Sequence, residues 1–135
     1  MSTSQRMHKD LKNRVAHNVA PLSYTIDAAG RTMGRVASEA AQCLLGKKSA
    51  QFVKNKVLPV DVTITNAAKL RLPEKRVSSK EYTRYTGYPG GLREYTLADL
   101  IAKKGIASAL EKAVDGMLPR NKLRKERMKR LTITD

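Results

Sequence analysis

Several groups of residues are of types that could carry chemistry or binding, and the first is the run Gly46-Lys47-Lys48-Ser49. It partly matches a phosphate-binding loop, whose pattern G-x-x-x-x-G-K-[ST] leads from a strand into a helix. Here position 41 is alanine and position 48 is lysine, and the run follows a helical pattern instead of opening one. The sequence therefore predicts the end of a helix here and no small-molecule nucleotide substrate.

Histidine and cysteine residues are too few and too scattered for metal binding or covalent catalysis. His8 and His17 lie near the N-terminus, and Cys43, the only cysteine, falls on an apolar helical pattern. Such a cysteine is commonly a small buried residue, and no histidine follows His17 to act as its base. A single cysteine also excludes an internal disulfide and suits a reducing compartment. We expect no catalytic residue, no metal, no cofactor and therefore no enzyme.

A segment rich in glycine and tyrosine is a candidate contact surface for nucleic acid. Three glycines fall within residues 87–91, and glycine lets a backbone approach a phosphate without obstruction by Cβ. The rings of Tyr82, Tyr85 and Tyr88 offer flat faces for stacking on bases. Arg84 and Arg93 add positive charge beside them. The alternative is a tight turn with its tyrosines packed into the core. The run 87–90 also fits the GXXG loop of KH domains, but that loop joins two helices and this one follows a strand-like segment.

The most basic segment lies between residues 120 and 130. It contains one acid, Glu126, and seven basic residues: Arg120, Lys122, Arg124, Lys125, Arg127, Lys129 and Arg130. A run this one-sided repels itself in water, which favours a phosphate partner over a merely solvated face. A second basic group, around the first predicted helix, consists of Arg31, Arg35, Lys47 and Lys48, for which a role in solubility alone is the alternative.

The overall charge points to a polyanionic partner. Lysine and arginine total 27 against 12 acids, a formal net charge of +15, with a sequence pI near 10.3. Nucleic acid is the usual polyanion for such a chain. A membrane is the other, but no run approaches the roughly 20 apolar residues of a span, and the first residues contain no apolar signal segment. We therefore expect a cytoplasmic protein with no membrane partner.

Apolar periodicity predicts the elements that position these groups. In the first half of the chain we expect a strand over 23–27, a helix over 33–45 ended by Gly46, a strand over 60–65 with Pro59 at its start or at a sheet edge, and a weaker strand-like piece over 70–73. In the second half we expect a charged loop over 74–80, a strand over 82–86, a helix that begins at Thr96 with Asp99 as its capping partner and breaks near Gly105, a further helix to Met117, a basic helix capped by Asn121, and a strand over 131–134.

Strands that alternate with helices favour an α/β fold with a mostly parallel sheet. A length of 135 residues fits one domain. Residues 1–22 are polar and basic, so we expect a basic N-terminal arm over 1–22 and a single α/β domain over 23–135.

Six runs, taken together, resemble the ribosomal protein L13 family in its bacterial form. They are Tyr24-Thr25-Ile26-Asp27-Ala28, Gly34-Arg35-Val36-Ala37, Leu45-Gly46-Lys47, Asn66-Ala67, Gly87-Tyr88-Pro89-Gly90-Gly91-Leu92, and Gly116-Met117-Leu118-Pro119-Arg120-Asn121-Lys122-Leu123. The chain departs from the family pattern at Ser23, where the family usually has tryptophan, at Tyr85, where it has histidine, and in the loops around 57–60 and 73–74.

The resemblance implies a compact three-layer α/β/α domain with a small, mostly parallel sheet, a basic N-terminal arm and a basic C-terminal helix. It also implies a structural role in the large ribosomal subunit, contact with ribosomal RNA and neighbouring large-subunit proteins, and support of subunit assembly. Carried over by position, the residues expected at or near RNA are Arg35, Lys47, Arg84, Tyr88, Gly90, Gly91, Arg120, Asn121 and Lys122. Charge and stacking capacity add Arg31, Lys48, Tyr85, Arg93, Arg124, Lys125, Arg127, Lys129 and Arg130.

Two rival functions belong to other classes. A DNA-binding, nucleoid-type protein fits the composition equally well and predicts similar affinity for duplex DNA and folded ribosomal RNA. A small nucleotide-binding or phosphotransfer enzyme predicts saturable binding of mononucleotides, and the broken phosphate-loop pattern speaks against it.

Overall fold

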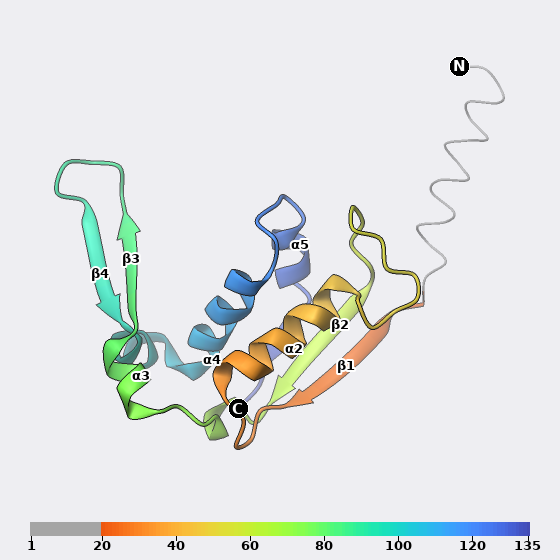
Figure 1. Ribbon diagram of the computed structural model, residues 1–135, viewed down its shortest axis with the longest axis horizontal. Coiled ribbons are helices and arrows are strands. Elements are labelled where there is room, and N and C mark those ends of the chain that lie inside the picture. The colour runs from red at the N-terminus through yellow and green to blue at the C-terminus, as the bar shows by residue number, and fades with distance from the viewer. Residues whose placement is uncertain (1–19) are drawn as a thin grey trace, which may run out of the picture.

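Three parallel strands form the central sheet of the computed structural model, which describes residues 20–135 (Figure 1). β1 (Leu22–Asp27) and β5 (Leu131–Ile133) pair on either side of β2 (Val60–Thr65). Each strand lies within one residue or so of its predicted position, and Pro59 directly precedes β2. The predicted arm over 1–22 lies outside the described residues as far as residue 19, and β1 already begins at Leu22.

Helix α2 (Met33–Leu45) packs its apolar face on this sheet. Its buried residues include Val36, Ala40 and Leu44, at helical spacing as predicted. Gly46 ends the helix in the left-handed conformation, with φ 81°, and its N–H donates to the carbonyl of Cys43. The left-handed backbone conformation favours glycine here, and a Cβ would in addition lie 2.5 Å from Cδ1 of Leu58, so that this side chain would have to shift. The predicted helix end is confirmed.

The segment after β2 differs from its prediction. A short 3-10 turn, η1 (Ala67–Lys69), leads to α3 (Glu74–Ser79), which the sequence analysis assigned to a charged loop. That assignment is wrong, because residues 74–79 form a helix. The ring of Pro73 fixes the backbone angle φ at the start of the helix, and the Glu74 carboxylate interacts favourably with the positive end of the helix dipole. Val77 then packs the short helix against the core.

Helix α4 (Leu97–Met117) begins with the predicted capping box. The Thr96 hydroxyl accepts from the Asp99 N–H at 3.2 Å, and the Thr96 N–H donates to Oδ2 of Asp99 at 3.0 Å. Gly105 is non-helical, with φ 83° and ψ 171°, so the helix is kinked where the sequence predicts a break. Its second half buries Ala109, Leu110 and Val114 in the core, and α4 packs against α2.

Replacing Thr96 with alanine is expected to lower the free energy of unfolding by about 1 kcal/mol at neutral pH, because the cap oxygen is lost. The Thr96 N–H and hydroxyl both hold the pKa of Asp99 below its ordinary value. Their contribution to stability is therefore present above the unfolded-state pKa and is lost as pH falls through the folded value. Urea unfolding at pH 7 and pH 3 should show a smaller effect of Thr96→Ala at pH 3. Thr96→Ser, which keeps the oxygen, should restore most of the stability; failure to do so would contradict the capping role.

A two-stranded antiparallel hairpin stands apart from the sheet at the far end of the molecule (Figure 1). It consists of β3 (Glu81–Tyr85) and β4 (Leu92–Thr96), joined by the glycine-rich loop. β3 is close to its predicted position, whereas β4 was not predicted. The last helix, α5 (Arg124–Met128), spans only five residues. Asn121 does not cap it: its side chain accepts from the Leu123 N–H at 3.1 Å in the preceding turn.

The helices of residues 20–135 gather on one side of the sheet. α2 lies across β1 and β2, and α4 packs beside α2 (Figure 1). Alternate residues of β2 reflect this: Val60, Val62 and Ile64 are buried, whereas Asp61 is exposed. The α/β class with a small parallel sheet is confirmed. The family resemblance implies three layers, and residues 20–135 form two of them, one of helices and one of strands.

No helix within residues 20–135 is long and apolar enough to cross a membrane.

Candidate nucleic-acid interface

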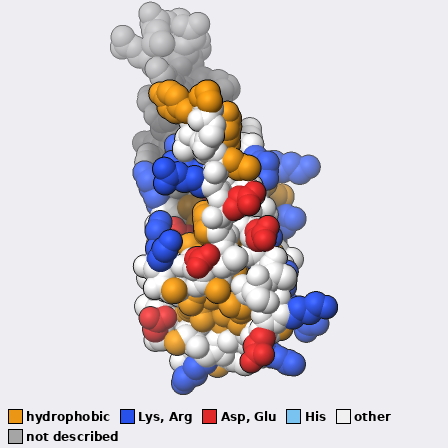
Figure 2. All heavy atoms as spheres, turned by 90° about the vertical axis from the view of Figure 1, so that its left-hand side faces the viewer, with side chains coloured by type: hydrophobic (Ala, Val, Ile, Leu, Met, Phe, Trp, Pro, Cys, Tyr) orange, Lys and Arg blue, Asp and Glu red, His pale blue; other side chains and the backbone are white. Residues whose placement is uncertain are grey.

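The tip of the β3–β4 hairpin exposes two of the predicted RNA-binding tyrosines. Tyr85 is 63% and Tyr88 is 76% exposed. Figure 2 views the molecule from the hairpin side and shows apolar side chains at its upper end with basic side chains below them. Such exposed rings are available for stacking on bases. Tyr82 is different, because it is half-buried at the base of the hairpin and stacks on Tyr95 with ring centroids 5.5 Å apart.

Two arginines face each other across the hairpin. Arg84 pairs with Arg93 in the antiparallel register, and both side chains are exposed. Like charges directly opposite each other on a sheet are destabilising. A bound anion would relieve this repulsion, so the pair suits a phosphate partner.

The glycines of the loop are needed for its own closure. A Cβ at Gly91 would lie 1.9 Å from Oγ1 of Thr86 and 2.9 Å from the Tyr88 carbonyl oxygen. Gly87 and Gly90 have φ of 90° and 74°, a region that side chains rarely adopt, with open space around them. The backbone conformation and the close contacts within the loop therefore suffice to explain glycine at these positions. Close approach of RNA to Gly90 and Gly91 stays a prediction.

The C-terminal basic segment presents most of its charges to solvent. Arg120, Asn121, Lys122, Lys125 and Lys129 are all exposed. Two of its arginines are held by ion pairs on other elements: Arg124 lies 3.2 Å from Asp115 of α4, and Arg130 lies 3.4 Å from Asp61 of β2. The segment therefore keeps a strong positive charge on a surface tied to the core.

Arg127 is a correction to the predicted site. Its side chain is only 1% exposed, and one terminal nitrogen donates to the Lys56 carbonyl at 3.4 Å. Its Nε and the other terminal nitrogen have no hydrogen-bond partner among residues 20–135. In α5 this position turns inward, beside Met128, so Arg127 is not placed to contact RNA. Periodicity over a five-residue helix was too short to reveal the inward face.

The basic group around α2 is partly neutralised. Glu39 accepts from Arg31 at 2.8 Å and from Lys48 at 3.3 Å, and the hydrogen bond from Arg31 holds the pKa of Glu39 below its ordinary value. Lys48 also lies over the Tyr24 ring, 5.4 Å from its centroid. Arg35 and Lys47 are exposed. Of this group, Arg35 and Lys47 are therefore better placed than Arg31 and Lys48 to meet a phosphate.

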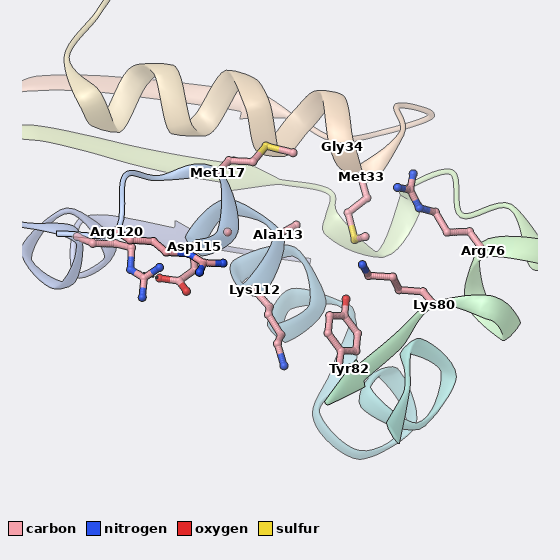
Figure 3. Close-up of a pocket in the computed structure, with 12 residues that line it drawn as sticks. Met33, Gly34, Arg76, Lys80, Tyr82, Lys112, Ala113, Asp115, Met117 and Arg120 are labelled. Carbon is pink, nitrogen blue, oxygen red and sulfur yellow. Dashed lines mark ion pairs between the residues drawn. The ribbon is translucent and has the colours of Figure 1, made fainter. Parts of the chain in front are cut away.

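A basic hollow that the sequence analysis missed lies between the start of α2, α3 and α4 (Figure 3). It has a volume of about 570 Å³, and its basic lining residues are Arg76, Lys80, Lys112, Arg120 and Arg124. In Figure 3, Lys80 and Lys112 approach Tyr82 from different elements. No spacing in the sequence could have identified this set, because the polar composition of residues 74–80 predicts a loop and Lys112 has no basic neighbour close to it in the sequence.

Metal chemistry finds no support in the part of the chain that the structure describes. Residues 20–135 contain no cluster of three His, Cys, Asp or Glu side chains able to hold a metal ion. Cys43 is fully buried, as predicted. His8 and His17 lie outside the described residues.

These features define a small, basic α/β protein whose exposed cations gather on a hairpin, a C-terminal segment and a hollow between helices. The family model described as Ribosomal protein L13 matches residues 22–134. The chain belongs to the ribosomal protein L13 family. Members of this family are structural components and not enzymes, so the expectations of family and of no enzymatic activity are confirmed.

Three relatives illustrate the match, and each is a large ribosomal subunit protein uL13. The chain is 45% identical to that of Moorella thermoacetica over 87% of this chain and 81% of the relative. It is 41% identical to that of Alcanivorax borkumensis over 82% and 77%. It is 39% identical to that of Thermus thermophilus over 91% and 87%.

Proposed function

We propose that the protein is a structural constituent of the large ribosomal subunit in the cytoplasm, where it binds ribosomal RNA, contacts neighbouring ribosomal proteins and supports subunit assembly. The observation that carries this proposal is the family match over residues 22–134, together with relatives that are large-subunit proteins. The net charge of +15 supports the same proposal on physical grounds, because RNA phosphates around the chain would neutralise it.

Binding is electrostatic and geometric. Exposed lysines of the 120–130 segment and the paired Arg84 and Arg93 neutralise phosphates, and Tyr85 and Tyr88 at the hairpin tip stack on exposed bases. Recognition follows RNA shape more than base sequence, because most of these contacts are made by charges. The role is to hold RNA segments together, with no reaction catalysed.

Co-sedimentation of the tagged protein with ribosomal particles, across a salt series in native cell extract, tests the proposal. We expect retention on the large subunit at salt concentrations that strip non-specific RNA binders. Release into the soluble pool, or migration with chromosomal DNA, would contradict it and favour the DNA-binding alternative. Competition with duplex DNA in the same extract is the control for charge alone.

A further inference from the structure

We propose that a continuous basic groove over α4, centred on Lys112, binds the sugar–phosphate backbone of one RNA strand. This inference rests on the proposed function and extends the RNA-binding surface of the 120–130 segment across α4 to α3, apart from the hairpin tip. The site includes residues that neither charge runs nor family motifs identified.

The groove consists of two hollows that meet over α4. The first, of about 570 Å³, lies toward α3 and the start of α2 (Figure 3). The second, of about 670 Å³, lies toward α5 and β4. Lys112, Asp115 and Arg124 line both hollows, so the two are adjacent and these side chains form their common border. A chain that crosses α4 at Lys112 would occupy both.

Cations dominate the groove along its whole length. Eight different basic side chains line the two hollows, against only two acids, Glu111 and Asp115. Asp115 is already paired with Arg124 at 3.2 Å. The cations are spread over α3, α4 and the 120–130 segment and do not converge on one point. Such a spread fits the repeated charges of a polynucleotide backbone better than a single small anion.

The aromatic rings of the groove are not available to bases. Tyr82 and Tyr95 stack on each other, and the Lys112 ammonium lies 4.3 Å and 4.8 Å from their centroids. Lys80 lies 5.5 Å from the Tyr82 centroid, and Lys112 also donates to the Tyr95 hydroxyl. The rings therefore hold the ammonium group of Lys112 in place, by cation–π attraction and the hydrogen bond. This arrangement offers a positioned positive charge but no free aromatic face. The groove therefore contacts phosphates, whereas the tyrosines of the hairpin tip stack on bases.

Salt-dependent binding to large-subunit ribosomal RNA tests the groove. The test variant replaces Arg76, Lys80 and Lys112 with glutamine, and the matched control replaces Lys54, Lys69 and Lys103, which lie outside both hollows. All six side chains are exposed, so both variants should fold, as circular dichroism and thermal melting will verify. Each lost phosphate contact lowers the slope of log K against log salt by roughly 0.7–0.9. We expect a loss of about 2 to 3 in slope for the groove variant and of less than about 1 for the control.

The outcomes separate the groove from the proposed function. Equal slopes for the two variants, with wild-type preference for ribosomal RNA intact, would overturn the groove and leave the proposed function standing. A wild-type chain that binds duplex DNA as tightly as ribosomal RNA would overturn the proposed function. The groove variant should also lose affinity for poly(A) and poly(U) to the same extent, and a loss confined to one polymer would contradict backbone recognition.

Discussion

Replacing Lys122, Lys125 and Lys129 with glutamine is expected to weaken binding to large-subunit ribosomal RNA by about 10²-fold near physiological salt. All three lysines are exposed on the 120–130 segment. If each meets a phosphate, the slope of log K against log salt falls by about 2 to 3 in total. Filter binding across a salt series measures both quantities, and an unchanged slope would show that the segment only keeps the protein soluble.

Arg127 supplies an internal control for that experiment. Because its side chain is buried, Arg127→Met should leave the salt slope unchanged, whereas the single change Lys125→Gln should lower it by roughly 0.7–0.9. Only one nitrogen of the buried guanidinium has a hydrogen-bond partner among the described residues, and replacing such a poorly satisfied buried charge by an apolar side chain is often neutral or stabilising. We therefore expect Arg127→Met to retain or raise the melting temperature. A fall in slope equal to that of Lys125→Gln would mean that Arg127 reaches RNA in the complex.

Replacing Leu110 with alanine is expected to lower the free energy of unfolding by about 3 kcal/mol. Leu110 is fully buried in the second half of α4, which packs against α2. The truncation removes apolar contacts and leaves a cavity that the interface fills only in part. For a domain of this size the melting temperature should fall by roughly 10 °C.

Glu111, the residue next to Leu110, provides the control for any change that a substitution to alanine causes outside the core. Glu111 is exposed on the same helix, so Glu111→Ala should change stability by no more than about 0.5 kcal/mol. Urea unfolding of the two variants side by side measures the difference. Equal effects would show that α4 does not contribute to the core as the structure indicates.

The sheet and the long helices were predictable because each has a strong local pattern. Val60–Thr65 alternates buried and polar residues, and α2 repeats small apolar residues at helical spacing. The Thr96 and Asp99 pair fixed the start of α4, and Gly105 its kink. Short elements were harder: α3 has six residues, and five of them are polar or charged, which suggests a loop. Val77 is its one apolar residue, and its packing against the core helps to stabilise the helix.

The candidate site was predictable where charges lie together in the sequence and not where the fold gathers them. The positive charge of residues 120–130 is evident from the sequence. Arg127 is basic like its neighbours, however, and only the structure shows that its side chain is buried and not exposed. Lys112 and Arg76 stand in unremarkable surroundings in sequence, and only the contact of α3 with α4 unites them at one hollow. Nearest-neighbour patterns carry no information about such long-range proximity.

The position of β5 has a consequence for how the protein folds as it is synthesised. β5 is the last of the described elements to be translated, yet it pairs with β2, and nearly 70 residues separate them. Until Leu131–Ile133 emerge, β2 has one open edge, which is a site of unwanted pairing. Helices and the hairpin can form during translation from local contacts, whereas the sheet closes only after chain elongation has passed residue 133.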